Sequence, residues 1–447
     1  MGTARSGLKL KSRELHRRIA PLREPDNITN FGYLLVDYLT LAAIVLFTIA
    51  FHENRIVHGM HWLWDVPVVL LAIVAIGGVQ HRFAGLGHEA SHYVLFRNRW
   101  LNELASDFLC MFPILATTHQ YRLVHLAHHQ FTNDWERDPD LANIGRSKMM
   151  DRFPMSRSDF VFNYYFRFFL PTFLLVYLWD VLQLSVLGGG RNPYADRGKA
   201  KQEVVVNIRL TSVLGVLYVV SLIVVLGIIN AYSPSSWLLA LVPAVFLLVG
   251  TGAAWLFPER AFFVAPIKSV SSSKVTACMR LAYMTGLVSA FAWLGYLTGR
   301  NWGGWLVLLW YVPLVTSFAY FMLLRDVYQH ANADRGRLTN SRVFFCDPLT
   351  RWAVFVYGQD IHLTHHLFPA VPHYRLRELH ETLRRYCPEY AEKVVECEGT
   401  FANESGRPSI LDVVTPGPRS GSRGGVRVSS SNRGLSERSL RNSTLVR

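Results

Sequence analysis

The sequence contains little cysteine and little charge. Its 447 residues include only five cysteines, and no two of them are spaced as a Cys-x-x-Cys pair. Neither a thiolate metal site nor a disulfide framework is therefore indicated, and we expect free thiols. Charged residues make up 17% of the chain and hydrophobic residues 51%. This balance disfavours an ordinary soluble protein and favours a multi-span membrane protein.

Acidic residues are scarcer than basic ones, which gives a formal net charge of +14. Much of the excess lies at the two ends: residues 1–24 hold seven Lys or Arg against two Glu, and residues 416–447 hold seven Arg against one Glu. These charges flank apolar runs or lie in a Ser/Gly/Arg-rich stretch without folded patterning, so we expect no nucleic-acid partner. Residues 1–30 and 401–447 are predicted to be cytoplasmic tails, and attraction to anionic lipid or to an acidic redox partner is the alternative role.

Long apolar runs are abundant. A helix needs about 20 apolar residues to cross a bilayer, and runs near this length lie at residues 31–51, 62–83, 210–229, 237–257 and 305–324. A further span is expected before the turn near residues 299–304. No cleavable signal peptide is expected, because the polar N-terminal segment leads into a run of full spanning length without a small-residue cleavage site. We predict a membrane domain over residues 31–400.

The basic residues also predict a topology, since they favour the cytoplasmic side. The loop at 230–236 carries no charge, whereas the loop at 258–280 carries four basic residues, which places the first outside and the second in the cytoplasm. The apolar segment 159–188 has basic residues at both flanks, which favours an interfacial or re-entrant segment over a simple crossing. The predicted fold class is an all-α membrane protein. It has about six transmembrane helices, this segment and a histidine-rich cap, with the cap and both termini in the cytoplasm.

Three short segments are rich in histidine: His88-Glu-Ala-Ser-His92, His125-Leu-Ala-His128-His129 and His362-Leu-Thr-His365-His366. On a helix, residues three and four apart share a face, so each segment can point its imidazoles toward a common position. Eight imidazoles exceed the needs of one ion, and neutral imidazole suits Fe, Zn, Cu or Ni rather than Mg or Ca. We therefore predict two metal ions, bound by His88, His92, His125, His128, His129, His362, His365 and His366, with His330 just past the final span as a ninth ligand.

Carboxylates near these segments are expected to accept hydrogen bonds from the imidazoles and so to fix their tautomers. The candidates are Asp138 and Asp140 of an Asp-Pro-Asp turn, Asp326 one turn before His330, and also Glu89 and Asp134. A solvated polar loop is the alternative for the Asp-Pro-Asp turn.

Other isolated polar residues are expected to be structural. His81 and His119 lack a partner motif, and His373 and His380 receive no role. Two acids in or near the first spans, Asp37 and Asp65, are expected to lie at the interface or to pair with polar groups.

The order HxxxH, HxxHH and HxxHH, with a long span-containing insert before the third segment, resembles the membrane fatty acid desaturase and hydroxylase superfamily. The resemblance covers roughly residues 81–390. The stretch Tyr121-Arg-Leu-Val-His-Leu-Ala-His-His129, with Asp138-Pro-Asp-Leu141 after it, is similar to the branch with rhizobitoxine-type desaturases and carotenoid ketolases. The segment from His366-Leu-Phe-Pro369 through Leu379 is similar to the corresponding stretch of acyl desaturases.

This resemblance implies two iron ions held almost wholly by histidine, with O2 as co-substrate, that oxidise a lipid hydrocarbon chain. Forming a C=C bond removes two electrons from the substrate whereas O2 needs four to become water, so an external donor must supply two. The sequence has no cytochrome b5-like His-Pro-Gly-Gly segment, which predicts a separate donor protein of the ferredoxin or cytochrome b5 type. It also has four apparent spans between the second and third histidine segments where the simpler family pattern has two, which weakens inference of the substrate.

Three alternatives remain open. Acyl desaturation is favoured, but hydroxylation or ketolation of a carotenoid or other lipid shares the first hydrogen abstraction. The segment His88-Glu89-Ala-Ser-His92 also matches the HExxH zinc motif of metalloproteases, although that class leaves both HxxHH segments unexplained. A transporter would place ionisable residues at mid-membrane in helices broken by Gly or Pro, whereas these clusters lie at span ends.

Overall fold

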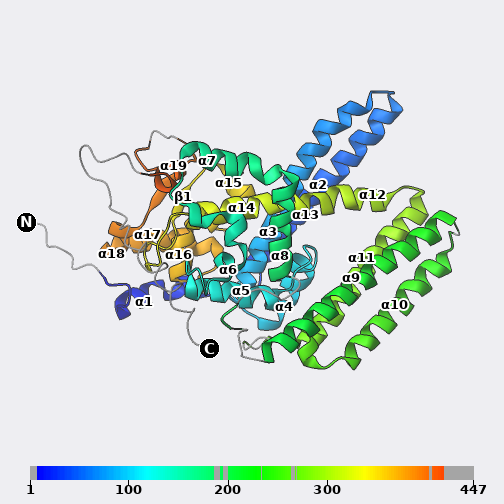
Figure 1. Ribbon diagram of the computed structural model, residues 1–447, viewed down its shortest axis with the longest axis horizontal. Helices are drawn as coiled ribbons and strands as arrows, with labels where there is room; N and C mark the ends of the chain where they lie inside the picture. Colours follow the sequence, from blue (N-terminus) through cyan, green and yellow to red (C-terminus); the bar gives the residue numbers. More distant parts are fainter. Residues whose placement is uncertain are drawn as a thin grey trace, which may run out of the picture.

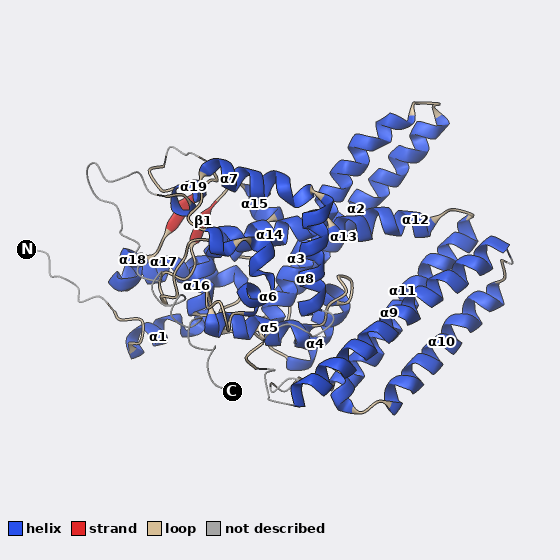
Figure 2. Cartoon of the chain, viewed as in Figure 1, coloured by secondary structure: helices blue, strands red, loops and turns tan. Residues whose placement is uncertain are grey.

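The computed structural model describes residues 8–185, 192–194, 200–232, 234–262, 267, 269–401 and 405–416. Helices dominate these residues, as predicted (Figures 1 and 2). The exception is a two-stranded parallel sheet, in which β1 (Val343–Phe345) pairs with β2 (Glu396–Glu398). The β-branched and aromatic side chains of β1 suit a strand. The pairing holds the C-terminal part of the chain against the cap, which is the histidine-bearing part of the molecule outside the spans.

Among the described residues, six helical segments are long and apolar enough to cross a membrane, which confirms the predicted number. They contain α2 (Thr29–Val57), α3 (Asp65–Ser91), α9 (Ala200–Tyr232), α10 (Ser236–Leu256), α11 (Ser273–Thr298) and, in the last span, α12 (Trp302–Leu306), α13 (Val312–Val315) and α14 (Ser317–His330). The chain is thus a multi-pass membrane protein. Two spans extend beyond their apolar runs, so that α3 carries His88 and α14 ends at His330.

The remaining helices are shorter. The α-helices are α1 (Arg13–Ile19), α4 (Arg99–Ser106), α5 (Thr118–Phe131), α6 (Pro139–Lys148), α7 (Arg157–Val161), α8 (Pro171–Ser185), α15 (Pro348–Ala353), α16 (His362–Leu367), α17 (Leu376–Tyr386), α18 (Pro388–Lys393) and α19 (Ile410–Val414). One-turn π-helical segments lie at Asp107–Met111, Phe162–Phe166 and Val307–Tyr311. Single 3₁₀ turns lie at Ala20–Arg23, Trp62–Trp64, Met150–Arg152, Arg167–Phe169, Glu259–Ala261, Gln359–Ile361 and His373–Arg375.

The segment predicted to be interfacial or re-entrant is bent. Its two helical halves, Arg157–Phe169 and Pro171–Gln183, meet at 82°. Pro171 lacks a backbone N–H and disfavours a helical conformation at the preceding residue, and Leu170 is accordingly extended. The bend agrees with the prediction, whose range to residue 188 continues outside the described residues.

Three spans, α9, α10 and α11, form a group of their own beside the rest of the molecule (Figure 1). They pack through a buried cluster of Leu222, Leu226, Ile229, Leu239 and Val288. Their outward faces expose large apolar side chains, such as Leu248 and Leu256. Lipid tails are as apolar as these side chains, so the exposure suits a bilayer.

The two acids of the early spans are paired, as expected. Asp37 is buried and accepts a hydrogen bond from Arg82 Nε at 2.5 Å, and the Tyr357 hydroxyl donates to its other oxygen. Asp65 lies 2.8 Å from Arg55 Nε and 2.8 Å from His52 Nδ1. Through Arg82 and Tyr357, the contacts of Asp37 join α2 and α3 to the loop before the third histidine segment.

Parts of both predicted tails are folded. Helix α1 packs near α17, with Leu15 and Ile19 fully buried. Helix α19 likewise buries its apolar side chains in the cap. The tails were predicted from charge, whereas a few apolar residues spaced four apart are sufficient to dock a short helix. Residues 417–447 lie outside the described residues.

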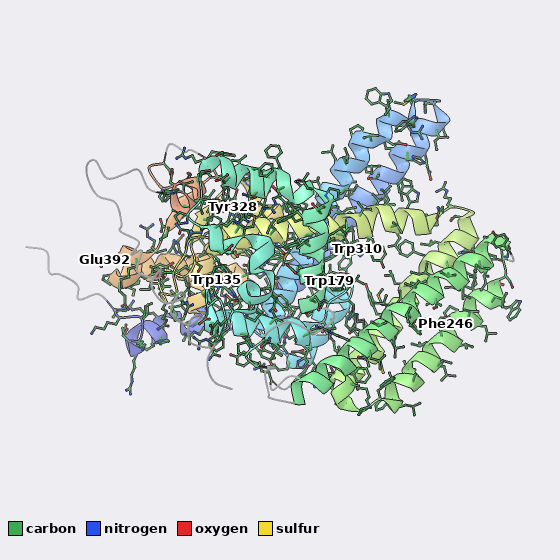
Figure 3. The ribbon with its side chains drawn as sticks, in the orientation of Figure 1. Trp135, Trp179, Phe246, Trp310, Tyr328 and Glu392 are labelled. Atoms are coloured by element: carbon green, nitrogen blue, oxygen red, sulfur yellow. The ribbon has the colours of Figure 1, made fainter. Side chains whose placement is uncertain are left out.

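The fold places the turn before α10 and the cap at opposite ends of the spans. In a background without native cysteines, Ser235→Cys should react with a membrane-impermeant maleimide from one side of sealed vesicles. Glu392→Cys, in the cap (Figure 3), should react only from the other. Labelling of both positions from the same side would contradict the six-span arrangement, and permeabilised vesicles supply the control for reactivity.

Candidate metal centre

The nine histidines singled out in the sequence converge in two groups. The five-histidine group consists of His88, His92, His125, His129 and His365, and the four-histidine group of His128, His330, His362 and His366. Each group draws on helices far apart in sequence: the five-histidine group on the end of α3, α5 and α16, and the four-histidine group on α5, the end of α14 and α16. Every one of these side chains is buried or half-buried.

The two HxxHH segments are divided between the groups. His125 and His129 point to the five-histidine group while His128 points to the four-histidine group, and in the third segment His365 alone joins the five-histidine group. With 3.6 residues per turn, neighbouring residues lie about 100° apart around a helix, whereas residues i and i+4 are nearly in line. We expected each HxxHH segment to direct its imidazoles to one position, but each contributes histidines to both groups.

Within each group several Nε2 atoms lie very close together. Those of His92 and His125 are 2.9 Å apart, those of His125 and His129 3.0 Å, and those of His129 and His365 3.0 Å. In the other group, His362 Nε2 lies 2.9 Å from that of His330 and 3.0 Å from that of His366. Ligand nitrogens about 2.1 Å from a metal and at right angles to one another would be about 3.0 Å apart. The donor set therefore fits a bound cation at each group.

Burial keeps most of these imidazoles in the form that binds metal. It lowers the pKa of His125, His129 and His365 well below the usual value, and neighbouring histidines lower it further. The pKa values of His362 and His366 are lowered in the same way. Neutral imidazole has a free lone pair and is the ligand form.

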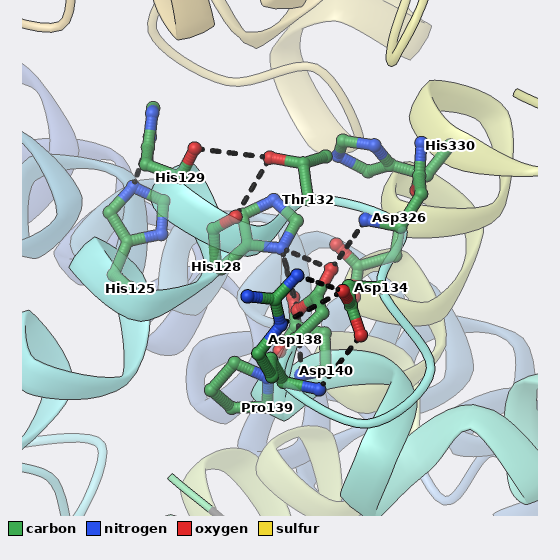
Figure 4. A network of polar contacts seen from close by, with 12 residues as sticks. His125, His128, His129, Thr132, Asp134, Asp138, Pro139, Asp140, Asp326 and His330 are labelled. Atoms are coloured by element: carbon green, nitrogen blue, oxygen red, sulfur yellow. Dashed lines mark hydrogen bonds and ion pairs between the residues drawn. The ribbon is translucent and has the colours of Figure 1, made fainter. Parts of the chain in front are cut away.

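Three imidazoles of the four-histidine group have partners at their second nitrogen. His128 Nδ1 lies 3.0 Å from Asp138 Oδ1 and 3.5 Å from Asp140 Oδ2 (Figure 4). His330 Nδ1 lies 3.0 Å from the Asn340 carbonyl oxygen, and His366 Nδ1 3.3 Å from Thr132 Oγ1. Such contacts hold the proton on Nδ1 and direct Nε2 toward the group.

The Asp-Pro-Asp turn is therefore not a solvated loop. Asp138 is buried, caps α6 through the amide of Asp140, and also accepts from the amide of Asn133. Burial opposes charge on His128, but the two carboxylates outweigh it and raise the pKa of His128 to about 9.

Asp326 contacts cations rather than a histidine. Its carboxylate accepts from Lys148 Nζ at 2.5 Å and from Arg325 at 3.0 Å, and Lys148 lies 4.0 Å from Asp140. Lys148 thus links Asp326 to Asp140, one of the two carboxylates beside His128. Asp134 pairs with Arg137 and Arg335 and touches none of the nine histidines through a described contact.

Matches to a family model decide the relationship that the histidine order suggested. Residues 60–264 and 229–396 both match the model described as fatty acid desaturase. The chain belongs to the fatty acid desaturase family. The two matches overlap at residues 229–264, around α10, in the region where two additional spans were inferred.

Several relatives are desaturases by name. Dihydrorhizobitoxine desaturase of Bradyrhizobium elkanii is 21% identical over 408 residues, which cover 90% of this chain and 88% of that protein. Delta(12) fatty acid desaturase fat-2 of Caenorhabditis elegans is 29% identical over 115 residues, 25% of this chain and 27% of the relative. An sn-1 oleoyl-lipid 12-desaturase of Arthrospira platensis is 33% identical over 89 residues, 19% of this chain and 25% of the relative. The desaturase family makes this protein an oxidoreductase.

The glutamate of the HExxH match is engaged elsewhere. Glu89 is buried, accepts from the His373 backbone amide at 2.7 Å, and lies 3.3 Å from His88 Nδ1. It therefore supports a histidine and a loop of this protein, which leaves the protease alternative without its general base.

Two contacts at the centre were not predicted. His373 supplies that amide, and its Nε2 lies 2.8 Å from Asn30 Oδ1. Gln359 Nε2 lies 3.2 Å from His88 Nδ1. Neither residue belongs to a histidine segment, so spacing gives no signal for them; the nearness of Gln359 to His362 is the one available hint. His81, predicted to be structural, lies 2.8 Å from the Ala353 carbonyl oxygen and in neither group.

An apolar cavity of about 290 Å³ lies among the spans of this protein. Its wall combines residues of α2, α3, α11 and the last span, including Val45, Phe83, Leu287 and Trp305. Phe83 precedes His88 by five residues on α3, which is about 7.5 Å along the helix axis.

We expect Asp138→Ala to weaken metal binding at the four-histidine group about 10–100-fold, because His128 loses the acceptor that fixes its orientation. Titration with a competing chelator, followed by metal analysis, measures the change. Asp134→Ala, four residues away in the same turn, is the control. Unchanged metal affinity in Asp138→Ala would contradict the orienting role.

Proposed function

We propose that the chain is an O2-dependent desaturase that holds one iron ion at each histidine group and introduces a double bond into a lipid hydrocarbon chain. The observation that carries the proposal is the convergence of nine imidazoles in two groups, with Nε2 atoms of seven of them 2.9–3.0 Å from a neighbour, in a member of this family. The proposed ligands are His88, His92, His125, His129 and His365 for one ion, and His128, His330, His362 and His366 for the other.

The choice of iron rests on chemistry. Imidazole donors suit Fe, Zn, Cu and Ni about equally well. Zinc has no redox chemistry, whereas removal of two hydrogens from a saturated chain is an oxidation. The family match and the desaturase names of the relatives support iron among the redox-active choices.

When bound, the iron ions would supply the activation of O2 for C–H oxidation. The protein's own groups prepare that site. Burial keeps His125 and His129 neutral, and Asp138 and Thr132 hold His128 and His366 in the orientation that exposes Nε2. The surrounding cap limits water around the reacting groups.

A lipid substrate is supported by two observations. Relatives named as oleoyl-lipid and fatty acid desaturases match parts of this chain, and the apolar cavity among the spans reaches α3 close to His88. An apolar wall recognises a hydrocarbon chain by exclusion of water.

The need for an electron donor follows from stoichiometry, and the orientation of the protein in the membrane is inferred from its charge. The substrate gives two of the four electrons that O2 requires, so a separate donor of the ferredoxin or cytochrome b5 type must give the others. The excess of Lys and Arg in the terminal segments supports a cytoplasmic location for the cap and both termini, where such donors operate.

Replacing any one ligand, for example His125→Ala or His362→Ala, should abolish turnover and lower bound iron below two ions per chain. His61→Ala, an exposed histidine at the other end of the spans, is the control and should retain both ions. Iron analysis of purified protein measures the outcome. Full activity and full iron content in either ligand variant would refute the two-iron assignment.

Expression with a matched electron donor, in a host of simple lipid composition, should yield an O2-dependent lipid product that is two mass units lighter on one acyl chain. Lipid mass spectrometry with and without O2 measures it, and the His125→Ala variant is the control. A gain of one oxygen would identify hydroxylation or ketolation instead. Protein that holds two irons but forms no O2-dependent product on a lipid would refute the substrate class.

A further inference from the structure

Two buried arginines occupy similar positions at the ends of two histidine-bearing spans. α3 ends at Ser91, directly before His92, and α14 ends at His330. After each of these two spans the chain turns through a residue with positive φ, Tyr93 at 62° after α3 and Asn332 at 57° after α14. The last carbonyl groups of a helix have no partner within the helix and need donors from elsewhere when they are buried. In both spans an arginine from another segment is such a donor.

Arg122 serves the end of α3. Its side chain is fully buried; Nε donates to the Ser91 carbonyl oxygen at 2.9 Å, and Nη2 donates to that of Ala90 at 2.9 Å. Glu103 pairs with the guanidinium, which also lies 3.9 Å from the ring centre of Tyr93. Arg122 therefore contacts residues on both sides of His92.

Arg122 also belongs to the helix that presents the next ligand. It precedes His125 by three residues on α5, so the same side chain connects α5 to the end of α3. His125 Nε2 lies 2.9 Å from His92 Nε2. The separation of these two ligand atoms therefore depends on a contact made by Arg122.

Arg342 has the corresponding position at the end of α14. Nη1 donates to the Tyr328 carbonyl oxygen at 2.9 Å and Nη2 donates to that of Ala331, on either side of His330. The Arg342 carbonyl oxygen accepts from the amide of Leu363 at 3.1 Å, next to His362. His330 Nε2 and His362 Nε2 are 2.9 Å apart. Arg342 thus connects two ligands of the four-histidine group.

We propose that Arg122 and Arg342 are positioning residues, one for each metal: Arg122 sets the geometry of the five-histidine group and Arg342 that of the four-histidine group. The inference rests on the ligand assignment of the proposed function. A guanidinium suits the role because its planar donors reach two carbonyl oxygens in a fixed arrangement and its permanent charge favours a helix C-terminus. The compact ammonium of lysine keeps the charge but has no such fork.

The test compares Arg122→Lys with Arg342→Lys. Each variant should bind one of its two ferrous ions about 10–100-fold more weakly than the wild type, as loss of a ligand-orienting contact typically does, and the other ion normally. Chelator competition with metal analysis gives the two affinities. Arg280→Lys is the matched control, because Arg280 donates to the Leu115 carbonyl oxygen, which adjoins none of the nine histidines.

Combination with ligand variants identifies which ion is weakened. In Arg122→Lys with His92→Ala, the ion that remains occupies the four-histidine group and should bind normally. In Arg122→Lys with His330→Ala, the remaining ion occupies the five-histidine group and should bind weakly. Arg342→Lys should give the opposite pattern with the same two histidine variants. A side chain needed only for general stability would weaken both ions equally in every combination.

Equal weakening of both ions, or unchanged binding of both, would overturn the proposal. Size-exclusion profiles and thermal unfolding of the metal-free variants establish that each is folded, and Arg122→Gln and Arg342→Gln replace any lysine variant that is not. A wild-type protein that binds fewer than two ions would refute the ligand assignment of the proposed function itself. That result is separate from the arginine comparison.

Discussion

The repulsion between lone pairs on the histidine nitrogens is the constraint on which the rest of this structure depends. Five pairs of Nε2 atoms lie 2.9–3.0 Å apart, and burial keeps imidazoles such as those of His125 and His362 neutral. Neutral imidazoles at such distances attract one another only through a shared proton or a cation. In the absence of either, helix ends and loops must hold the rings together against their preference to separate.

Buried charge supplies much of that rigidity. Arg122 with Glu103, Lys148 with Asp326, and Arg82 with Asp37 each join segments that carry or adjoin ligands. A buried ion pair contributes little net stability, because desolvation offsets its attraction, yet removal of one partner leaves an uncompensated charge. Pairs of this kind are therefore better explained as fixing the positions of helices than as strengthening the fold as a whole.

The sequence predicted the spans and the nine histidines because both depend on local patterns. Apolar length identifies a span, and spacing by three and four identifies imidazoles on one helix face. The division of each HxxHH segment between two groups follows from the same helical geometry and was available in principle. Other features depend on long-range packing: the α1 contact with α17, the Gln359 contact with His88, and the two arginines at span ends. No local spacing marks Arg342 as a partner of Tyr328, since only the folded cap brings them together.

Each histidine group is also distributed over more than half of the chain, and this has a consequence for biogenesis. The five-histidine group needs residues from His88 to His365, and the four-histidine group needs residues from His128 to His366. The six spans of the described residues all lie before the third segment. A ribosome that has made the first two histidine segments has therefore made neither complete group, and four spans must still enter the bilayer. Under the proposed two-iron assignment, metal uptake therefore follows membrane insertion, and the newly inserted apo-protein is the species that receives the iron.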